Sequence, residues 1–280
     1  MSGISLPVPG GHEFLYTSRD FQQVRRLLYG RTGISLSESK EQMVYSRLSR
    51  RLRSLQLRSF AEYFGYLEGH AEEWQQFVNA LTTNLTAFFR ERHHFQALAE
   101  LAARQARGHR PLRFWSAASS TGEEPYSMAM SLVETLGFDA PVRILASDID
   151  TGVLETAERG VYPLDRVDAL SLAQKQRFLL RGKGANAGKV RVVEELRRLI
   201  EFRQINLLDS AWGVPGDLDA IFCRNVMIYF DKPTQTRLLE RMVRLLRPGG
   251  LFFAGHSESF VHAGHLVRPV GRSTYQAVGA

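Results

Sequence analysis

Four short apolar runs in the second half of the chain constrain its fold more than any other feature. They read LRFWSAAS, VRILASDI, LDAIFCR and GLFFAGH and begin at residues 112, 142, 218 and 250. Segments of helical character, such as 127–136 and 233–246, lie between them. Short apolar strands that alternate with helices form a mainly parallel sheet with helices on both faces. The sequence therefore predicts an α/β, doubly wound domain.

The segment between the second and third runs, about residues 160–202, has a different character. It contains RGVYPLDR, the glycine-rich RGKGANAGK and the alternating VRVVEEL. Glycine-rich turns beside valine-rich alternation predict a small antiparallel β-subdomain. Within it, KVRVVEEL (189–196) is expected to present an edge strand to which an extended peptide could add. The alternative is an insertion that only supports the neighbouring site.

The first 110 or so residues show helical periodicity and no convincing alternating strand. We therefore expect a helical domain over residues 1–85, a linker helix over 86–110 and the α/β domain over 111–280. In the segment 37–58, three leucines share one face of a helix and five arginines lie mostly on the opposite face: Leu48, Leu52 and Leu55 against Arg47, Arg50, Arg51, Arg53 and Arg58. This arginine surface either binds an acidic partner or is merely solvated.

Charge and composition narrow the class of protein. The net charge of +7 and a pI near 9.7 favour an acidic partner. No apolar run approaches the roughly 18 residues that a membrane span needs, and residues 1–14 lack the pattern of a signal peptide. The single cysteine, Cys223, excludes a disulfide framework and a thiolate metal cage, and we expect it to be buried and inert. We expect a reduced, cytoplasmic protein without a bound metal.

The loop after the first apolar run, in FWSAASSTGEEPYSMAM (114–130), indicates the ligand. It has one glycine, Gly122, followed by two acids, Glu123 and Glu124, and it lacks the G-x-G-x-x-G pattern of dinucleotide sites. A carboxylate about 4 Å from a phosphate charge would cost roughly 4 kcal/mol at an effective dielectric constant near 20. A cationic ligand without phosphate fits better, and S-adenosylmethionine has both properties.

The end of the second apolar run supports a nucleoside ligand. Asp148 ends ILASDID, and an acid at the end of the second strand suits the paired hydroxyls of a ribose. An Asp at such a position is also a common helix N-cap. Beside an acidic first loop, we prefer the ribose interpretation.

Five longer motifs resemble the CheR family of chemotaxis receptor methyltransferases: NLTAFFRERHHF, SAASSTGEEPYS, ASDID, FCRNVMIYFDKPTQ and LRPGGLFFAGHSES. The resemblance runs from the N-terminal helices nearly to the C-terminus. It implies a helical N-terminal receptor-recognition domain and a Rossmann-like methyltransferase domain with a small β-subdomain. It also implies methyl transfer from S-adenosylmethionine to glutamate side chains of chemoreceptors, with S-adenosylhomocysteine as product.

The resemblance also assigns roles to residues of this chain. Asn84, Thr86 and Arg90 would contact the cofactor, with Arg90 nearest the reacting methyl group. Glu123 would hold the methionine ammonium group and Asp148 the ribose. The remaining cofactor contacts would be Asn206, Leu207, Arg224 and Asn225, and Tyr229 would face the methyl group unless it is a core aromatic.

The implied chemistry is a direct displacement at the sulfonium methyl group. A glutamate with a pKa near 4.3 is already ionised at pH 7, so no general base is required. Arg90 could hold the incoming carboxylate by forked hydrogen bonds, and Tyr229 could fix its other oxygen. The implied partners are the cytoplasmic helical bundle of chemoreceptors and, as in some relatives, a pentapeptide at the receptor C-terminus. We expect no nucleic acid and no membrane insertion.

Two other function classes compete with this interpretation. The high pI favours a nucleic-acid methyltransferase, but CRNVMIYF stands where such enzymes usually carry an Asn/Asp-Pro-Pro-aromatic segment. A non-catalytic adaptor is disfavoured because the cofactor motifs are intact. The adjacent His93 and His94 point about 100° apart on a helix and so predict a poor metal pair. His256 could border the pocket, but nothing indicates that it is catalytic.

Overall fold

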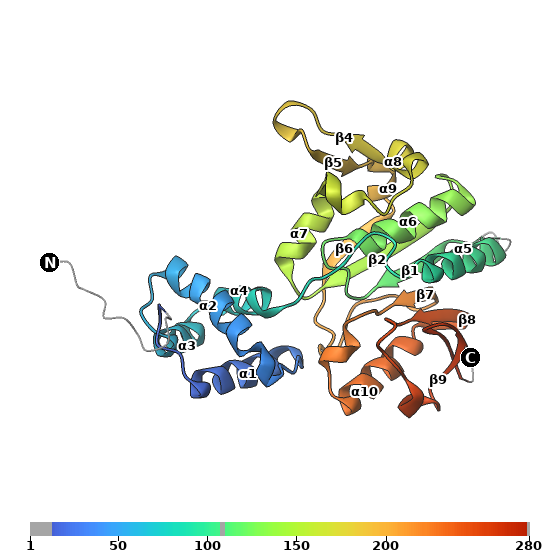
Figure 1. Ribbon diagram of the computed structural model, residues 1–280. Helices are drawn as coiled ribbons and strands as arrows, with labels where there is room; N and C mark the ends of the chain where they lie inside the picture. Colours follow the sequence, from blue (N-terminus) through green and yellow to red (C-terminus); the bar gives the residue numbers. More distant parts are fainter. Residues whose placement is uncertain (1–12, 107–109, 279–280) are drawn as a thin grey trace. The chain divides into compact units, whose positions relative to one another are not determined.

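The computed structural model describes residues 13–106 and 110–278, and the chain divides into two compact units, Met1–Thr83 and Asn84–Ala280 (Figure 1). The sequence expectation for the first 14 residues lies almost wholly outside the described part. Within the described residues, none of the helices is both long and apolar enough to cross a membrane.

Every described element of the first unit is helical. The helices are α1 (Ser18–Thr32), η1 (Glu38–Lys40), α2 (Glu41–Leu55), α3 (Phe60–Gly69) and α4 (Ala71–Leu81). Helix α1 begins at a capping box, in which the Thr17 hydroxyl accepts from the Asp20 N–H and the Asp20 carboxylate accepts from the Thr17 N–H. Buried residues at helical spacing, such as Leu48 and Leu52 of α2, form the core. Leu55 is only partly buried.

The second unit is built around a seven-stranded sheet. Its strands are β1 (Leu112–Ser116), β2 (Val142–Asp148), β6 (Ile200–Gln204), β7 (Leu218–Phe222), β8 (Leu246–Phe253), β9 (Val267–Gly271) and β10 (Thr274–Ala277). The strand order is β6-β2-β1-β7-β8-β10-β9. The first five strands pair in parallel, and β10 is antiparallel to both of its neighbours. The α/β prediction is confirmed, and the C-terminal hairpin β9–β10 is an element that the sequence analysis missed.

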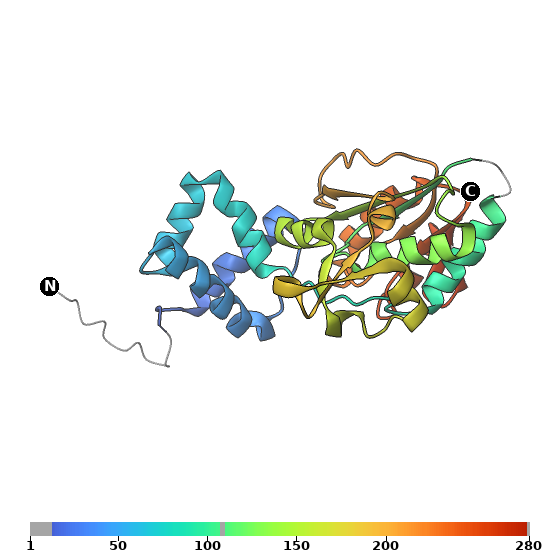
Figure 2. The same cartoon turned by 90° about the horizontal axis from the view of Figure 1, so that it is seen from above.

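Both faces of this sheet are buried, as the apolar runs predict. On one face, Phe114, Ile144 and Phe222 belong to a core shared with α5 (His93–Gln105) and α6 (Glu123–Leu136). On the other face, Trp115 packs against Trp212 at a ring-centroid distance of 5.2 Å. Helix α10 (Lys232–Val243) packs against β8. The sheet and the side-by-side helices α5 and α6 can be followed in Figure 2.

Helix α5 differs from the expected linker helix. Its residues Phe95, Leu98 and Leu101 are buried in the core of the second unit, and the helix packs directly against α6. The division after Thr83 assigns the whole segment from Asn84 to the second unit. A periodic helix pattern specifies an apolar face but not the element that the face contacts, which is why the sequence alone misplaced it.

The insertion forms a separate three-stranded sheet with the order β3-β5-β4. It comprises β3 (Val161–Pro163), η3 (Leu164–Val167), α8 (Leu172–Phe178), β4 (Leu179–Arg181), η4 (Gly184–Asn186), β5 (Lys189–Val192) and α9 (Glu194–Arg197), which follow α7 (Thr151–Arg159). The expected edge strand was wrong: β5 is the central strand, paired with β3 and β4, and the rest of KVRVVEEL enters α9. The expected boundary at 202 was also wrong, because β6 pairs with β2 in the large sheet.

Candidate active site

The loops that follow the parallel strands carry most of the predicted site residues. In open α/β sheets, ligands bind at the carboxyl ends of the strands. Here the Ser120–Glu124 segment follows β1, Asp148 ends β2, Asn206 follows β6, and Arg224 follows β7. The topology therefore brings residues from four distant parts of the sequence to one edge of the sheet.

The first loop is shaped by close packing around Gly122. Gly122 has a φ of 96°, and a Cβ atom on it would lie 2.8 Å from both the Ala157 Cβ and the Tyr162 hydroxyl oxygen. Only glycine fits this conformation and this close approach. Ser119 is fully buried, and its hydroxyl has no hydrogen-bond partner within the described residues. The loop thus offers a buried hydroxyl group and a helix start that is flanked by acids.

Glu123 and Glu124 have separate environments. The Glu123 side chain is fully buried, its Oε2 accepts from the Thr121 hydroxyl at 2.6 Å, and its Oε1 is paired with the Arg166 guanidinium. Glu124 accepts from the Ser116 hydroxyl at 2.8 Å and from Arg224 at 2.9 Å. Burial raises the pKa of Glu124 even though Arg224 and Ser116 act in the opposite direction. Both acids are therefore paired inside the second unit, Glu124 with the buried Arg224 and Glu123 with the partly exposed Arg166.

Asp148 does not cap the following helix. The N-cap of α7 is Asp150, whose carboxylate accepts from the backbone N–H groups of Gly152 and Val153. Asp148 accepts from the Ser120 N–H at 2.8 Å and from the Asp150 N–H at 3.0 Å. Burial raises the pKa of Asp148 to about 6, against the lowering effect of these backbone hydrogen bonds. Each carboxylate oxygen retains capacity for a further donor.

The Arg90 turn has a strained backbone. Phe89 and Glu91 have φ values of 50° and 60°, in the left-handed region that these residue types rarely adopt. The Phe89 N–H donates to the Ser127 hydroxyl, and Arg224 donates to the Arg90 carbonyl oxygen at 2.6 Å. The Arg90 side chain itself donates to the Leu85 carbonyl oxygen at 2.9 Å. Such strain persists only where surrounding contacts impose it, and it is common at functional sites.

Arg224, predicted to line the cofactor pocket, has a side chain that is 2% exposed. It ties together Glu124, the Arg90 carbonyl oxygen and Glu91, whose Oε2 lies 3.4 Å from its Nη2. Arg224 therefore positions the Arg90 turn through its contacts with the Arg90 carbonyl oxygen and the Glu91 carboxylate. Asn84, another predicted cofactor contact, donates to the Asp150 carboxylate at 2.7 Å, and Thr86 is partly buried in the same segment.

Glu258 is a site residue that the sequence analysis missed. This buried carboxylate accepts from the backbone N–H groups of Asn225 at 3.0 Å, Met227 at 2.8 Å and Gly255 at 2.6 Å. It thereby holds the segment that carries Asn225, which has a φ of 58°, and the partly buried Tyr229 of η5 (Met227–Tyr229). The signal in the sequence was the acid of AGHSES, three residues beyond Gly255.

The loop expected at the adenine is held by a stacked arginine. The Arg241 guanidinium lies 3.8 Å from the ring centroid of Trp212 and donates to the carbonyl oxygens of Leu207, Asp209 and Ser210. Asn206 accepts from the Leu208 N–H at 3.0 Å. The backbone around the predicted pair Asn206 and Leu207 is therefore fixed by Arg241.

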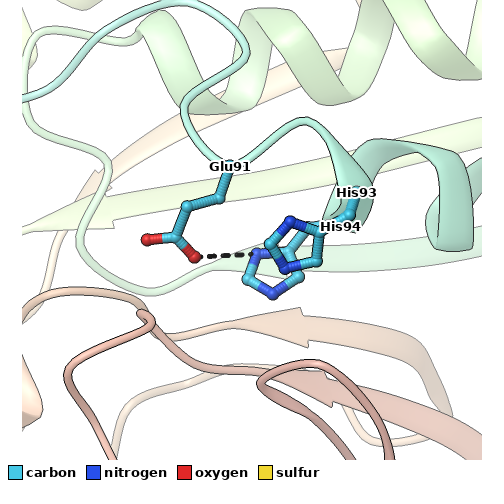
Figure 3. Close-up of side chains that lie close together, drawn as sticks. All are labelled: Glu91, His93 and His94. Atoms are coloured by element: carbon cyan, nitrogen blue, oxygen red, sulfur yellow. Dashed lines mark ion pairs between the residues drawn. The ribbon is translucent and has the colours of Figure 1, made fainter.

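Figure 3 shows Glu91, His93 and His94, whose ligand-type atoms all lie within 4.8 Å of one another. The ring centroids of His93 and His94 are 4.1 Å apart. The two side chains thus lie closer together than the predicted angle of about 100° between them suggested. Burial, with the charges of Arg224 and His93, lowers the pKa of His94 to about 3. Burial alone would raise the pKa of Glu91, but Arg224 and hydrogen bonds from His256 lower it. Because Glu91 already faces the Arg224 guanidinium, we interpret the cluster as an anchor of the Arg90 turn and assign no metal to it.

The five arginines of the predicted arginine surface fall into two groups. Arg51 forms a forked pair with the buried Glu73, with distances of 2.9 and 2.6 Å, and Arg47 donates to the carbonyl oxygens of Ala80 and Thr82. These two side chains stabilise the first unit internally. Arg50, Arg53 and Arg58 are exposed. The sequence pattern could not reveal this difference because Glu73 and Thr82 are distant in the chain.

The residues at the strand ends fit S-adenosylmethionine. Asp148 is a buried carboxylate with acceptor capacity left, Glu123 is a second buried carboxylate beside Arg166, and the unpartnered Ser119 hydroxyl can accept or donate a further hydrogen bond. The fold and these buried acids are those expected of a methyltransferase that uses S-adenosylmethionine as its cofactor, and the family models assign the chain to this class. The family model for the S-adenosylmethionine-binding domain of CheR methyltransferases matches residues 84–275, and that for the CheR all-α domain matches residues 19–82. The chain belongs to the CheR methyltransferase family.

The chain is similar to chemotaxis protein methyltransferase 2 of Pseudomonas aeruginosa, with 72% identity over 270 residues and 96% of each chain covered. It is 55% identical over 244 residues to the chemotaxis protein methyltransferase of Salmonella typhimurium, covering 86% of this chain and 83% of that one. The Escherichia coli protein of the same name is 52% identical, with 91% and 89% covered. The solved structure of a TehB-like methyltransferase from Corynebacterium glutamicum matches only weakly, with a TM-score of 0.35 and 13% identity over 76% of this chain and 99% of that one.

Proposed function

We propose that this protein transfers the methyl group of S-adenosylmethionine to glutamate side chains of chemoreceptors, forming methyl esters that adapt chemotaxis signalling in the cytoplasm. The observation that carries this proposal is the site itself. A buried acid without an internal capping role ends β2, a second buried acid begins α6, and the strained Arg90 turn is anchored at the same edge of the sheet. The similarity to chemotaxis protein methyltransferases over nearly the whole chain supports the choice of substrate.

The roles of the residues follow from their chemistry. We assign Glu123 to the methionine ammonium group, Asp148 to the ribose, and Asn206 and Leu207 to the adenine. Asn84, Thr86 and Asn225 complete the cofactor site, while Arg224 acts through Glu91 and the Arg90 carbonyl oxygen. When bound, the cofactor supplies an electrophilic methyl group on a sulfonium centre.

The protein contributes alignment and charge to the reaction. Arg90 holds the acceptor carboxylate, which is ionised at neutral pH, so that one oxygen faces the methyl group. Tyr229 limits the path of the acceptor or bonds its second oxygen. The cofactor would leave as a neutral thioether and the acceptor carboxylate is already ionised, so no residue of the protein would have to move a proton.

Two surfaces could bind the receptor. The exposed Arg50 and Arg58 offer positive charge to an acidic helical bundle, and the exposed Arg53 beside them pairs with Glu13 at 2.8 Å. In the β-subdomain, the outer strands are β3 and β4, and β3 contains Pro163, which lacks a backbone N–H. The outer edge of β4 is therefore the better place for an added receptor peptide.

The test is incubation with radiolabelled S-adenosylmethionine and three acceptors: receptor-containing membranes, DNA and RNA. Label in receptor that mild base releases as methanol supports glutamate methyl esters. Label retained in nucleic acid would instead support the competing nucleic-acid methyltransferase. Binding of the cofactor without transfer to any acceptor would favour a non-catalytic adaptor.

A further inference from the structure

Arg166 reaches the candidate cofactor site from the β-subdomain. It belongs to η3 (Leu164–Val167), which follows β3, and its guanidinium pairs with Oε1 of Glu123 at the start of α6. Glu123 is fully buried, whereas the Arg166 side chain is 40% exposed. A buried carboxylate needs a partner because desolvation without compensation is costly. Arg166 is therefore the charge partner of the acid that we assign to the cofactor.

The same part of the insertion is tied to the first loop at a second point. The Tyr162 hydroxyl donates to the Thr121 carbonyl oxygen at 2.6 Å, and the Thr121 hydroxyl donates to Glu123 Oε2 at 2.6 Å. The hydrogen bond from Tyr162 thus fixes β3, and with it the nearby Arg166, beside the loop that follows β1. Among the described residues, Arg166 donates a side-chain hydrogen bond only from Nη2, to Glu123 Oε1. The other guanidinium donors are available for a second acceptor.

We propose that Arg166 binds the carboxylate of the cofactor's methionine moiety, while Glu123 binds its ammonium group. This inference rests on the proposed placement of the amino-acid end of the cofactor at Glu123. An α-amino acid carries adjacent negative and positive charges, and Arg166 and Glu123 present adjacent charges of opposite sign. A guanidinium fork also matches a planar carboxylate better than an ammonium group does.

The competing model is that Arg166 only neutralises Glu123 and is displaced when the cofactor's ammonium group arrives. The two models predict opposite results for removal of Arg166. A direct contact to the cofactor carboxylate is lost on substitution, so affinity falls. A displaced competitor is removed on substitution, so affinity rises.

Isothermal titration calorimetry with two ligands tests the proposal without relying on turnover. S-adenosylhomocysteine has the amino-acid end, and 5′-methylthioadenosine lacks it. We expect Arg166→Ala to weaken S-adenosylhomocysteine about tenfold or more, since a hydrogen bond to a charged group is lost, and to change 5′-methylthioadenosine less than twofold. Arg166→Lys should recover part of the loss. Arg159→Ala, a change at an exposed arginine at the end of α7, is the matched control and should bind both ligands normally.

Glu123→Gln separates failure of this inference from failure of the proposed site. Unchanged or tighter S-adenosylhomocysteine binding by Arg166→Ala, or equal weakening of both ligands, overturns the role of Arg166. If Glu123→Gln nevertheless weakens S-adenosylhomocysteine alone, the placement at Glu123 stands. If Glu123→Gln has no effect either, the placement itself is wrong. Circular dichroism melting of each variant verifies that the protein is folded during the titrations.

Discussion

The guanidinium of Arg224 donates to the backbone carbonyl oxygen of Arg90, 134 residues away in the sequence, over 2.6 Å. The same guanidinium bonds Glu124 at 2.9 Å. One buried cation thus connects the loop after β7, the start of α6 and the turn that carries the proposed catalytic arginine. The left-handed backbone on both sides of Arg90 is held by this connection.

Arg224→Ala should lower both stability and turnover. Removing one partner of a buried pair leaves Glu124 uncompensated, which typically costs about 3–5 kcal/mol. The double variant Arg224→Met with Glu124→Gln should recover much of the stability but not the turnover, because the hydrogen bond to Arg90 is still absent. Urea unfolding and kcat measurements distinguish the two effects. Full recovery of kcat in the double variant would show that Arg224 has only a structural role.

Asp148 should make cofactor binding depend on pH. Burial raises its folded-state pKa to about 6 from a usual value of 3.8, so the native state binds the proton more tightly than the unfolded state. Its contribution to stability is therefore present at low pH and is lost as pH rises through about 6. Cofactor affinity should change in the opposite direction, because the ionised carboxylate is the better acceptor for ribose hydroxyls, and should fall as pH decreases below about 6.

The Asp148→Asn variant tests the predicted direction of the pH dependence of cofactor affinity. At pH 7.5 the variant should bind S-adenosylhomocysteine roughly tenfold or more weakly, from the loss of a charge-assisted hydrogen bond. It should unfold at the same or a higher temperature, since a buried charge is gone. Its affinity should also vary less between pH 5.5 and 7.5 than that of the wild type. A wild-type affinity that is flat over this range would contradict the ribose assignment.

Glu258→Gln should impair the loop that carries Asn225 and Tyr229. The carboxylate accepts three backbone N–H groups, and an amide NH2 in place of one oxygen would face at least one of these donors. We expect turnover to fall tenfold or more in folded protein, with a smaller effect on receptor KM. Steady-state kinetics and melting temperature are the measurements. Glu240→Gln, at a partly exposed side chain of α10 that forms a surface pair with Arg244, is the control.

The sequence suggested a chemistry for the site, but it did not reveal the contacts that support the site. Position after an apolar strand suggested a cationic ligand for the acidic first loop and a ribose for Asp148, whereas the role of Glu123 came from the family resemblance. The supporting contacts of Arg224 and Glu258 could not be predicted, since the partners lie 134 and 33 residues away and no local pattern marks such pairs. The prediction that KVRVVEEL forms an edge strand was wrong for the same reason. Alternation in KVRVVEEL indicates a strand, but whether a strand is central or outer depends on its neighbours in space.

The two groups of arginines in the first unit should respond differently to charge reversal. Arg50→Glu with Arg58→Glu changes exposed side chains and should raise the apparent KM for receptor several-fold without changing cofactor affinity. Native activity should also fall with added salt, because exposed charges are screened over about 8 Å at physiological ionic strength. Arg51→Glu should act through stability, since it would place a carboxylate against the buried Glu73 and the Tyr63 hydroxyl bonded to it. Receptor methylation assays and thermal melts of both variants check this contrast. Normal receptor KM in the exposed double variant would mean that this face is only solvated, and unchanged melting of Arg51→Glu would contradict the internal pair.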